Sequence, residues 1–456
     1  MTQTSTKVVQ TFSMAERLER LPFTSYQMKL MLVMGTAFFF DCIDFAMMTF
    51  ALTPMRTEFG LSTTQTGLLG SVTFIGMFIG GISAGLLADR FGRLRILQWS
   101  MIGWGTASLL CAFAPNIQIL IACRILLGIA MIMEPIAGLA LVSEFAPAKE
   151  RGKVMTYMEG LWPLGFIVAG ILSYVLIPIG GWRILFIAQS IPSLFVFFVR
   201  RNLPESPRWL EDKGQKQLAH EVMTAIEYKV QKAFGKPLPE PKILLLERLA
   251  SSGKSNLFEL FKPGLTKRTI MLWSLWFFAL LGYYGLTTWL GALLADKGYA
   301  VAKSSLYIAF ISLAGIPGFI VLSKLVDTWG RKPSMIFTMI GSAVSAYCYG
   351  NASNFTQVII FGLIMQFFMY GMWCALYAYT PDLYPTRLRA TGAGFASAFG
   401  RLGAIFGPYI VGVLLPMYGQ TGVFQLGAGA FIAGAITTFI LGEETKGRIL
   451  EEISSN

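Results

Sequence analysis

The chain has 456 residues, of which 54% are hydrophobic and 14% are charged, and its formal net charge is +12. A soluble domain carries about 25% charged residues, so this composition excludes an ordinary soluble enzyme or binding module. Apolar stretches of about 20 residues recur along the chain, and each is long enough to cross a bilayer as a helix. We therefore predict an all-α membrane protein that has the lipid bilayer as a partner.

The segment before the first apolar stretch, residues 1–27, is polar and lacks the short apolar core of a cleavable signal peptide. The distribution of positive charge predicts that this N-terminal segment is cytoplasmic. Within it, residues 14–21 predict either a short amphipathic helix on the membrane surface or a solvated tail. Twelve membrane spans are expected to follow. They are residues 28–53, 66–88, 95–114, 117–144, 154–178, 182–200, 268–294, 304–325, 333–351, 355–380, 391–416 and 421–442.

Positive charges fall almost entirely on one side of these spans. Six of the 37 Lys and Arg residues are exceptions, four in loops on the other side and two within spans: Arg56, Arg183, Lys297, Lys303, Arg124 and Arg401. The positive-inside rule therefore places both termini and the long central loop in the cytoplasm. The net charge follows from this topology.

The central loop at 201–267 divides the spans into two six-helix bundles, 28–200 and 268–442, and residues 443–456 form a cytoplasmic tail. The loop mixes basic and acidic residues without a basic stripe interleaved with aromatic residues, so no nucleic-acid partner is expected. Its residues 205–233 predict a helical segment, and 235–241 (GKPLPEP) a turn or linker.

Cysteine and histidine form no predicted metal or catalytic site. All five cysteines lie in apolar spans without metal-ligand spacing, and the single histidine, His220, lies in the central loop. The sequence has no Ser/His/Asp set and no phosphate-binding loop. We therefore predict no enzyme activity, no cofactor and no metal, and we expect any proton chemistry inside the membrane to use carboxylates.

Three pairs of segments repeat at a common spacing of 238 positions. The pairs are 85–93 (GLLADRFGR) with 323–331 (SKLVDTWGR), 144–147 (EFAP) with 382–385 (DLYP), and Glu205 with Glu443. Parallel repeats of this kind place a substrate site between the two halves, near the middle of the membrane.

The repeated segments also resemble the motifs of a known family. Residues 85–95 (GLLADRFGRLR) resemble the loop signature of the major facilitator superfamily, and 204–208 (PESPR), 381–387 (PDLYPTR) and 444–447 (ETKG) resemble sugar-porter motifs. The resemblance covers nearly the whole chain. It implies the twelve-helix major facilitator fold and alternating access. We expect the protein to be a monomer.

Charged residues at the cytoplasmic helix ends are predicted to form networks that hold the inner side shut and break when it opens. A static, solvated charge cluster that only fixes topology is the alternative. The predicted gating residues are Asp89, Arg90, Arg93, Glu144, Arg151, Glu205, Asp327, Arg331, Asp382, Arg389 and Glu443.

Charged residues within the expected spans are functional candidates, because a charge costs roughly 2.5–3.5 kcal/mol or more at the bilayer centre. They are Asp41, Asp44, Arg124, Glu134, Glu159 and Arg401. At about 1.5 Å per residue, Asp44 and Arg124 share a depth and are expected to pair. Protonation of Asp44 would then release Arg124 to an anionic substrate. A buried structural pair is the alternative.

Two other arrangements of these charges follow from spacing and depth. Asp41 and Asp44 are three residues apart and share a helix face, which favours proton binding to one of them. Glu134 and Arg401 are level in depth, and either is expected to bind the other or the substrate. Glu159 lies nearer the cytoplasm and fits a structural or a functional role equally. The predicted proton-coupling residues are Asp44, Asp41, Arg124 and Glu134.

Aromatic residues of the seventh and tenth spans are predicted to form a stacking box for a flat ring, with ordinary helix packing as the alternative. The predicted substrate-binding residues are Arg124, Arg401, Trp276, Tyr283, Tyr284, Trp289, Gln366, Trp373 and Tyr377.

The same spans resemble bacterial niacin (nicotinate) permeases. The similar segments are 40–44 (FDCID), 283–285 (YYG), 289–290 (WL), 376–381 (LYAYTP) and 399–403 (FGRLG). These permeases belong to a metabolite–proton symporter group that is also similar to the synaptic-vesicle SV2 and SVOP proteins. The resemblance implies an integral multi-pass protein of the bacterial inner membrane.

The leading hypothesis is proton-coupled uptake of a small aromatic carboxylate, with nicotinate first, because a flat ring with one carboxylate suits aromatic stacking plus an arginine. The expected partners are a small organic anion and a proton. The alternatives within transporters are a carrier of another aromatic acid such as benzoate, a sugar porter, and an exporter. From a different class, the alternative is a non-transporting sensor with a transporter fold.

Overall fold

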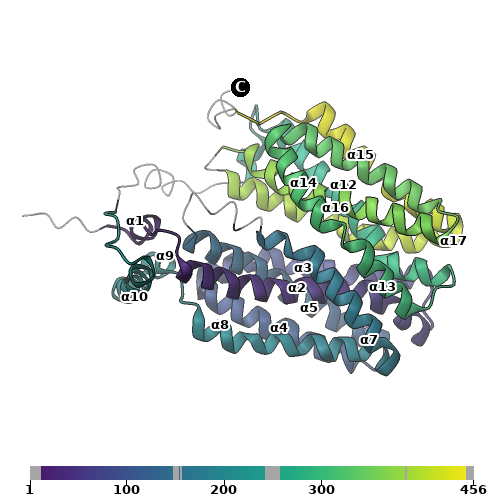
Figure 1. The fold of residues 1–456 in the computed structure, drawn as a ribbon, viewed down its shortest axis with the longest axis horizontal. Coiled ribbons are helices and arrows are strands. Elements are labelled where there is room, and N and C mark those ends of the chain that lie inside the picture. The colour runs from purple at the N-terminus through teal and green to yellow at the C-terminus, as the bar shows by residue number, and fades with distance from the viewer. Residues whose placement is uncertain (1–11, 147–153, 155–156, 242–256, 386–387, 448–456) are drawn as a thin grey trace, which may run out of the picture.

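The computed structural model describes residues 12–146, 154, 157–241, 257–385 and 388–447. Within this part of the chain every regular element is a helix, and no strand occurs. The predicted all-α class is therefore confirmed. Figure 1 shows the long helices in two bundles, one built from the N-terminal part of the chain and the other from the C-terminal part.

The first bundle contains long apolar segments that fold as helices, because a helix satisfies all of its backbone hydrogen bonds internally when no water is present. Its elements are α2 (Ser25–Glu58), α3 (Thr63–Phe91), α4 (Arg93–Ala112), α5 (Ile117–Phe145), α7 (Leu161–Ser190), η1 (Ile191–Phe195) and α8 (Val196–Asn202). The side chains of Ser62 and Asn116 cap the first turns of α3 and α5, and thereby fix where these helices begin.

The second bundle repeats this pattern. Its elements are η2 (Leu257–Phe261), α12 (Thr266–Asp296), α13 (Val301–Ser312), α14 (Gly315–Thr328), α15 (Arg331–Gly350), α16 (Phe355–Asp382) and α17 (Arg389–Leu441). The side chain of Asn354 caps α16 as Asn116 caps α5, and the two asparagines lie at equivalent positions of the repeat.

Eight helical segments of the described residues are long and apolar enough to cross a membrane. Two of them each contain a pair of expected spans. One pair lies in Tyr157–Asn202 and is separated by a bend at Gly180 and Gly181 of α7, and the other is separated by a bend at Gly419 of α17. Helices α4 and α15 occupy two further expected spans but are not among the eight. Twelve crossings and cytoplasmic termini therefore stay predictions.

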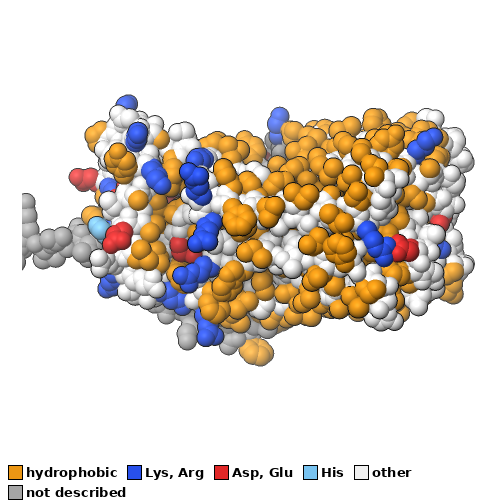
Figure 2. Space-filling model, turned by 90° about the horizontal axis from the view of Figure 1, so that it is seen from below, with side chains coloured by type: hydrophobic (Ala, Val, Ile, Leu, Met, Phe, Trp, Pro, Cys, Tyr) orange, Lys and Arg blue, Asp and Glu red, His pale blue; other side chains and the backbone are white. Residues whose placement is uncertain are grey.

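The surface of the first bundle matches a membrane environment. Figure 2 shows apolar side chains over the middle of the molecule and charged side chains toward its two ends. Large apolar residues are exposed on the helices of this bundle, for example Leu86 and Ile82 of α3, with 73% and 63% of their surface accessible. A face of this kind is suited to lipid contact.

Glycines allow the long helices of each bundle to approach closely. A methyl group at Gly76 of α3 would overlap the carbonyl oxygen of Ile125 in α5, and one at Gly128 would overlap that of Thr73. In the second bundle, Gly403 of α17 stands against the carbonyl oxygen of Phe277 in the same way. Small residues at helix crossings are what dense packing in lipid requires.

The two bundles meet at one end of the molecule. There the Arg56 side chain of α2 lies 3.4 Å from Asp296 of α12, and Gly67 of α3 packs against Gly412 of α17. We call this the closed end. At the opposite end, the ion pairs Arg93–Glu144 and Arg331–Asp382 each lie within one half, and Arg17–Glu227 joins the N-terminal segment to the linker. Figure 1 shows the ribbons of the two bundles diverging toward that opposite end.

Three short helices cover the opposite end of the first bundle, which we call the linker end. They are α1 (Met14–Glu19), α9 (Pro207–Asp212) and α10 (Lys216–Phe234). The predicted helical segment at 205–233 is thus confirmed as two helices. Met14 and Leu18 of α1 are buried in one apolar cluster with Met223 and Ile226 of α10. The segment at 14–21 is therefore packed on α10, and is not a solvated tail.

Candidate functional site

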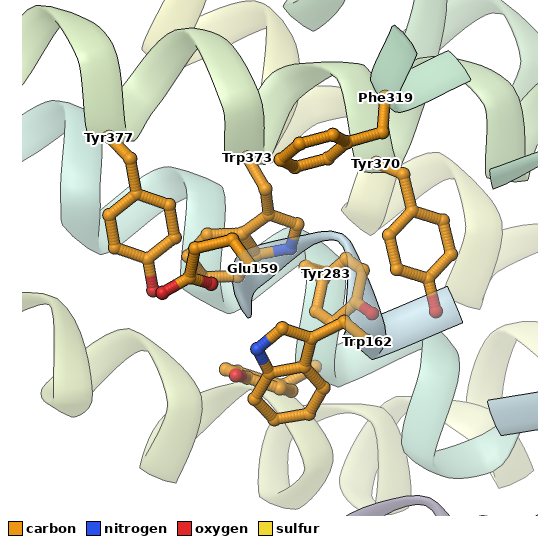
Figure 3. Close-up of a pocket in the computed structure, with 8 residues that line it drawn as sticks. Glu159, Trp162, Tyr283, Phe319, Tyr370, Trp373 and Tyr377 are labelled. Carbon is orange, nitrogen blue, oxygen red and sulfur yellow. The ribbon is translucent and has the colours of Figure 1, made fainter. Parts of the chain in front are cut away.

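A pocket lies between the two bundles. The space between its atoms, counted together with the part that is open to solvent, is about 340 Å³. Figure 3 shows its aromatic rings arranged around one carboxyl group. The residues that line it are Glu159, Trp162, Tyr283, Tyr284, Phe319, Tyr370, Trp373 and Tyr377.

The aromatic wall on α16 follows from helical spacing. Tyr370, Trp373 and Tyr377 are three and four residues apart, so they lie on one face of the helix. The rings of Trp373 and Tyr377 are stacked, with centroids 5.6 Å apart. Tyr283 of α12 meets Trp373 edge to face at a centroid distance of 5.3 Å. The helices α12 and α16 together thus form one continuous aromatic surface.

Tyr284 connects this surface to the first bundle. Its ring centroid lies 4.6 Å from that of Phe74 and 5.2 Å from that of Phe45. Phe45 in turn meets Trp162 edge to face at 5.3 Å. The pocket is therefore built by both halves of the chain, as the internal repeat predicts for a substrate site.

Two opposite charges lie at or near this pocket. Glu159, just before α7, accepts a hydrogen bond from the indole of Trp162 and interacts electrostatically with Arg401 of α17. Arg401 also interacts electrostatically with Tyr284 and is 3.6 Å from the sulfur of Met77, measured from Nη1. Arg401 is thus beside the pocket, although it does not line it.

Several pocket residues were missing from the predicted substrate set. Glu159 fitted a structural or a functional role equally in the sequence, and the structure brings it into the pocket. Trp162 lies one helical turn after Glu159, and Tyr370 lies one turn before Trp373, so helical spacing could have identified both. Phe319 of α14 carried no signal in the sequence.

Other predicted substrate residues lie outside the pocket. Trp276 packs against Tyr377 at a centroid distance of 5.6 Å and donates to the Thr380 hydroxyl at 3.0 Å, so it supports the pocket from behind. Trp289 donates to the carbonyl oxygen of Pro408 at 2.9 Å and is fully buried. Gln366 is buried in α16, and its Oε1 has no hydrogen-bond partner among the described residues.

The predicted proton-coupling residues form a separate group inside the first bundle. Asp41, Asp44, Arg124 and Glu134 are all buried. Arg124 interacts electrostatically with Asp44, but neither Asp44 oxygen has a hydrogen-bond partner in the described part of the chain. The expected direct Asp44–Arg124 pair is therefore not formed in this structure.

Glu134 and Arg401 likewise do not pair as their equal depth suggested. Glu134 accepts a hydrogen bond from the indole of Trp104 at 2.6 Å. Arg401 of α17 instead lies beside Met77 of α3, in the first bundle. Depth along a helix says nothing about which helix faces which. Glu134 instead belongs to the group that includes Asp41, with which it interacts electrostatically.

The predicted gating residues of the first bundle form a network at the linker end. Arg93 lies 3.2 Å from Glu144 and 3.9 Å from Asp89. Glu205 accepts from the backbone N–H of Leu94 at 3.1 Å and so caps the first turn of α4. Arg90 lies over the ring of Phe91 rather than in the network. Arg151 falls outside the described residues.

The second bundle repeats this network with one correction. Arg331 lies 3.1 Å from Asp382 and 3.6 Å from Asp327. The residue that caps α15 is Glu444, which accepts from the backbone N–H of Arg331 at 3.0 Å. Glu444 is thus the structural counterpart of Glu205, one position beyond the predicted Glu443.

Glu443 has a different role. It forms an ion pair with Arg268 at the start of α12, with an N–O distance of 2.9 Å. Arg389, the remaining predicted gating residue, is the first residue of α17. Acidic groups at the start of a helix accept hydrogen bonds from backbone N–H groups. They also face the positive end of the helix dipole, and this attraction stabilises the acidic groups there.

Known proteins match the chain over nearly all of its length. The family model described as Major Facilitator Superfamily matches residues 34–341 and 319–454. The niacin transporter NiaP of Acinetobacter baylyi is 35% identical over 96% of this chain and 99% of its own length. The putative niacin/nicotinamide transporter NiaP of Bacillus subtilis is 30% identical over 93% and 98%.

Solved structures agree on the fold. The inward-open xylose transporter XylE of Escherichia coli superposes with a TM-score of 0.76 over 94% of this chain and 99% of its own. Its sequence is 18% identical to this one, so the likeness concerns the fold alone.

Proposed function

Because this chain belongs to the major facilitator superfamily, we propose that it is a secondary active transporter that takes up a small aromatic carboxylate, nicotinate first, together with a proton. Members of this family are transporters and not enzymes. The single observation that carries the substrate proposal is the aromatic pocket between the halves with Arg401 beside it.

The pocket suits a flat aromatic ring. Trp373, Tyr283 and Tyr377 offer ring faces and edges at stacking distance, and stacked or edge-to-face rings are worth about 0.5–1.5 kcal/mol beyond their burial. Arg401 provides a positive charge for one carboxylate. The similarity to two proteins named as niacin transporters supports the same substrate.

Proton coupling is proposed for the buried carboxyl groups of the first bundle. A charged side chain buried at membrane depth marks a proton or substrate pathway by default. Both oxygens of Asp44 and one of Asp41 lack hydrogen-bond partners in the described part of the chain, and Arg124 is close enough to Asp44 to interact with it. Binding and release of a proton at Asp44 would therefore change the charge balance beside Arg124.

A sugar is the weaker alternative. A sugar site needs many hydrogen-bonding groups, because each buried hydroxyl that lacks a partner costs free energy. Seven of the eight residues that line this pocket are aromatic, so its wall is mainly ring surface, and its hydrogen-bonding groups are four tyrosine hydroxyls, two indole N–H groups and the carboxyl group of Glu159. The solved xylose symporters that resemble the chain are 17–20% identical to it and so share only its fold.

The wider organisation of the transporter completes the proposal. The two bundles, 28–200 and 268–442, would move against each other, with the linker end opening to the cytoplasm. Twelve crossings, cytoplasmic termini, a monomeric state and a bacterial inner membrane belong to the same proposal. Basic residues concentrated at the linker end support this orientation.

The test is uptake of labelled nicotinate into proteoliposomes with and without an inward proton gradient. We expect saturable uptake that the gradient drives above equilibrium. The variant Asp44→Asn should keep exchange of nicotinate but lose gradient-driven accumulation. Absence of saturable uptake would refute the substrate, and accumulation by Asp44→Asn equal to wild type would refute the coupling role.

The matched control is Glu221→Gln. Glu221 is an exposed carboxylate on α10, outside the bundles, and its loss should change neither uptake nor accumulation.

A further inference from the structure

Glu159 is a carboxylate in the wall of a pocket that is proposed to take an anion. Figure 3 shows its carboxyl group among the rings, between Tyr377 and Trp162. Two like charges placed side by side at a binding site repel each other, and sites avoid such pairs unless they serve specificity. A carboxylate at this place therefore calls for a positive or hydrogen-donating group on the ligand.

The neighbours of Glu159 hold it in place without neutralising it. The indole N–H of Trp162 donates to its carboxylate, and Trp162 is itself fixed by edge-to-face contacts with Phe38 and Phe45. Arg401 attracts Glu159 electrostatically, yet among the described residues the two make no direct ion pair. The pocket is thus flanked by a carboxylate and a guanidinium that do not contact each other.

The aromatic walls favour a positively charged ring. The faces of Trp, Tyr and Phe carry negative partial charge and attract cations, Trp most strongly. Trp162 and Trp373 both line the pocket beside Glu159. A flat ring with a positive edge at Glu159 and a carboxylate toward Arg401 would meet complementary groups on every side.

We propose that Glu159 binds the protonated ring nitrogen of a pyridine carboxylate, while Arg401 binds the carboxylate of the same molecule. This inference rests on the proposed function and narrows its substrate class to acids with a ring nitrogen. A single proton lies between the ring nitrogen and Glu159. The bound state is the same whether this proton arrives on the ring or on the carboxyl group.

The test compares nicotinate with benzoate, which has the same flat ring and carboxylate but a C–H group in place of the ring nitrogen. Binding of each acid to the purified full chain in nanodiscs is measured by calorimetry. We expect wild type to bind nicotinate at least about tenfold more tightly than benzoate, because a hydrogen bond to a charged group is worth a factor on the order of ten.

The variant Glu159→Gln should reduce that preference to about twofold or less by weakening nicotinate. Its affinity for benzoate should stay within about threefold of wild type, which also shows that the variant is folded. N-methylnicotinate, whose ring nitrogen is always positive and carries no proton, should lose affinity in Glu159→Gln as well.

Glu58→Gln is the matched control. Glu58 also accepts a hydrogen bond from an indole, that of Trp182 at 2.6 Å, and pairs with an arginine, Arg183. It lies at the closed end, away from the pocket, so its loss should leave the ratio of the two affinities unchanged.

The outcomes separate this inference from the proposed function. Equal affinities of wild type for the two acids, or equal weakening of both by Glu159→Gln, would overturn the role of Glu159 while leaving aromatic-acid transport intact. Binding of neither acid by wild type would overturn the proposed substrate and this inference together.

Discussion

A methyl group added at Gly412 is predicted to drive the two halves apart at the closed end. Gly412 lies in α17, and a Cβ atom at this position would be 2.5 Å from the carbonyl oxygen of Thr63 and 3.0 Å from the Cα of Gly67. Both neighbours are backbone atoms of α3, so no side-chain rotation relieves the overlap.

The size of the effect follows from the cost of overpacking. Inserting a methyl group into a close-packed contact costs roughly 1–3 kcal/mol, and every 1.4 kcal/mol is about a factor of ten. The overlap exists only while the closed end is closed. The ratio of molecules closed at this end to molecules open there should therefore fall about 5- to 150-fold.

The assay is the distance between two spin labels, one on each half, measured by pulsed electron paramagnetic resonance. Cysteines for labelling are introduced at the exposed positions Thr57 and Ala300, in a chain whose native cysteines have been replaced. Gly412→Ala should move the distance distribution toward longer values. Gly429→Ala is the control on the same helix, because no atom lies within 4 Å of a Cβ there.

A distribution for Gly412→Ala that superimposes on that of wild type would refute this reasoning. It would mean that the contact between α3 and α17 persists in every state, and that the halves do not separate along it.

Three further predictions concern the ends of the molecule. Glu444→Gln and Glu205→Gln should each lower the free energy of unfolding by about 1 kcal/mol in thermal denaturation in detergent. Each substitution removes the negative charge of a carboxylate that accepts hydrogen bonds from backbone N–H groups at a helix start. Asp296→Asn should change uptake by less than about fivefold, because its pair with Arg56 is partly exposed and such pairs are worth about 0–1 kcal/mol. Burial opposes ionisation of Glu227 on α10, but its bonds to Arg17 and Arg20 outweigh burial and hold the pKa of Glu227 below its ordinary value. These bonds therefore hold α1 on α10 at pH values above the ordinary pKa of a glutamate, and they are lost as the pH falls through the lowered pKa of Glu227. Limited proteolysis of α1 should detect this loss. Glu227→Gln should show the same loss already at neutral pH.

The sequence predicted the helices well because hydrophobic length is a local property. The expected spans 66–88 and 117–144 lie within α3 and α5, which extend no more than three residues beyond them at either end. The bends at Gly181 and Gly419, with φ of 64° and 62°, separate paired spans where the sequence already placed a loop. The repeat was also visible, because Asp89 and Asp327 are followed by the same pattern of residues.

Side-chain pairing could not be predicted in the same way. Glu443 and Glu444 are identical residues, and only the backbone N–H groups they face distinguish the cap of α15 from the partner of Arg268. The pocket shows the same limit, because Glu159 lines it without having been predicted to bind substrate, whereas the predicted Trp289 does not line it. Packing between distant segments decides which side of a helix faces the partner bundle. The periodicity of a single sequence does not reveal this packing.

Proton entry driven by nicotinate tests the proposed symport most directly. Proteoliposomes with equal pH on both sides and a pH-sensitive dye inside receive external nicotinate, under conditions that clamp the membrane potential. We predict acidification of the interior by the wild-type protein that saturates with nicotinate and is absent with Asp44→Asn. Nicotinate uptake without any acidification by wild type would contradict proton-coupled transport.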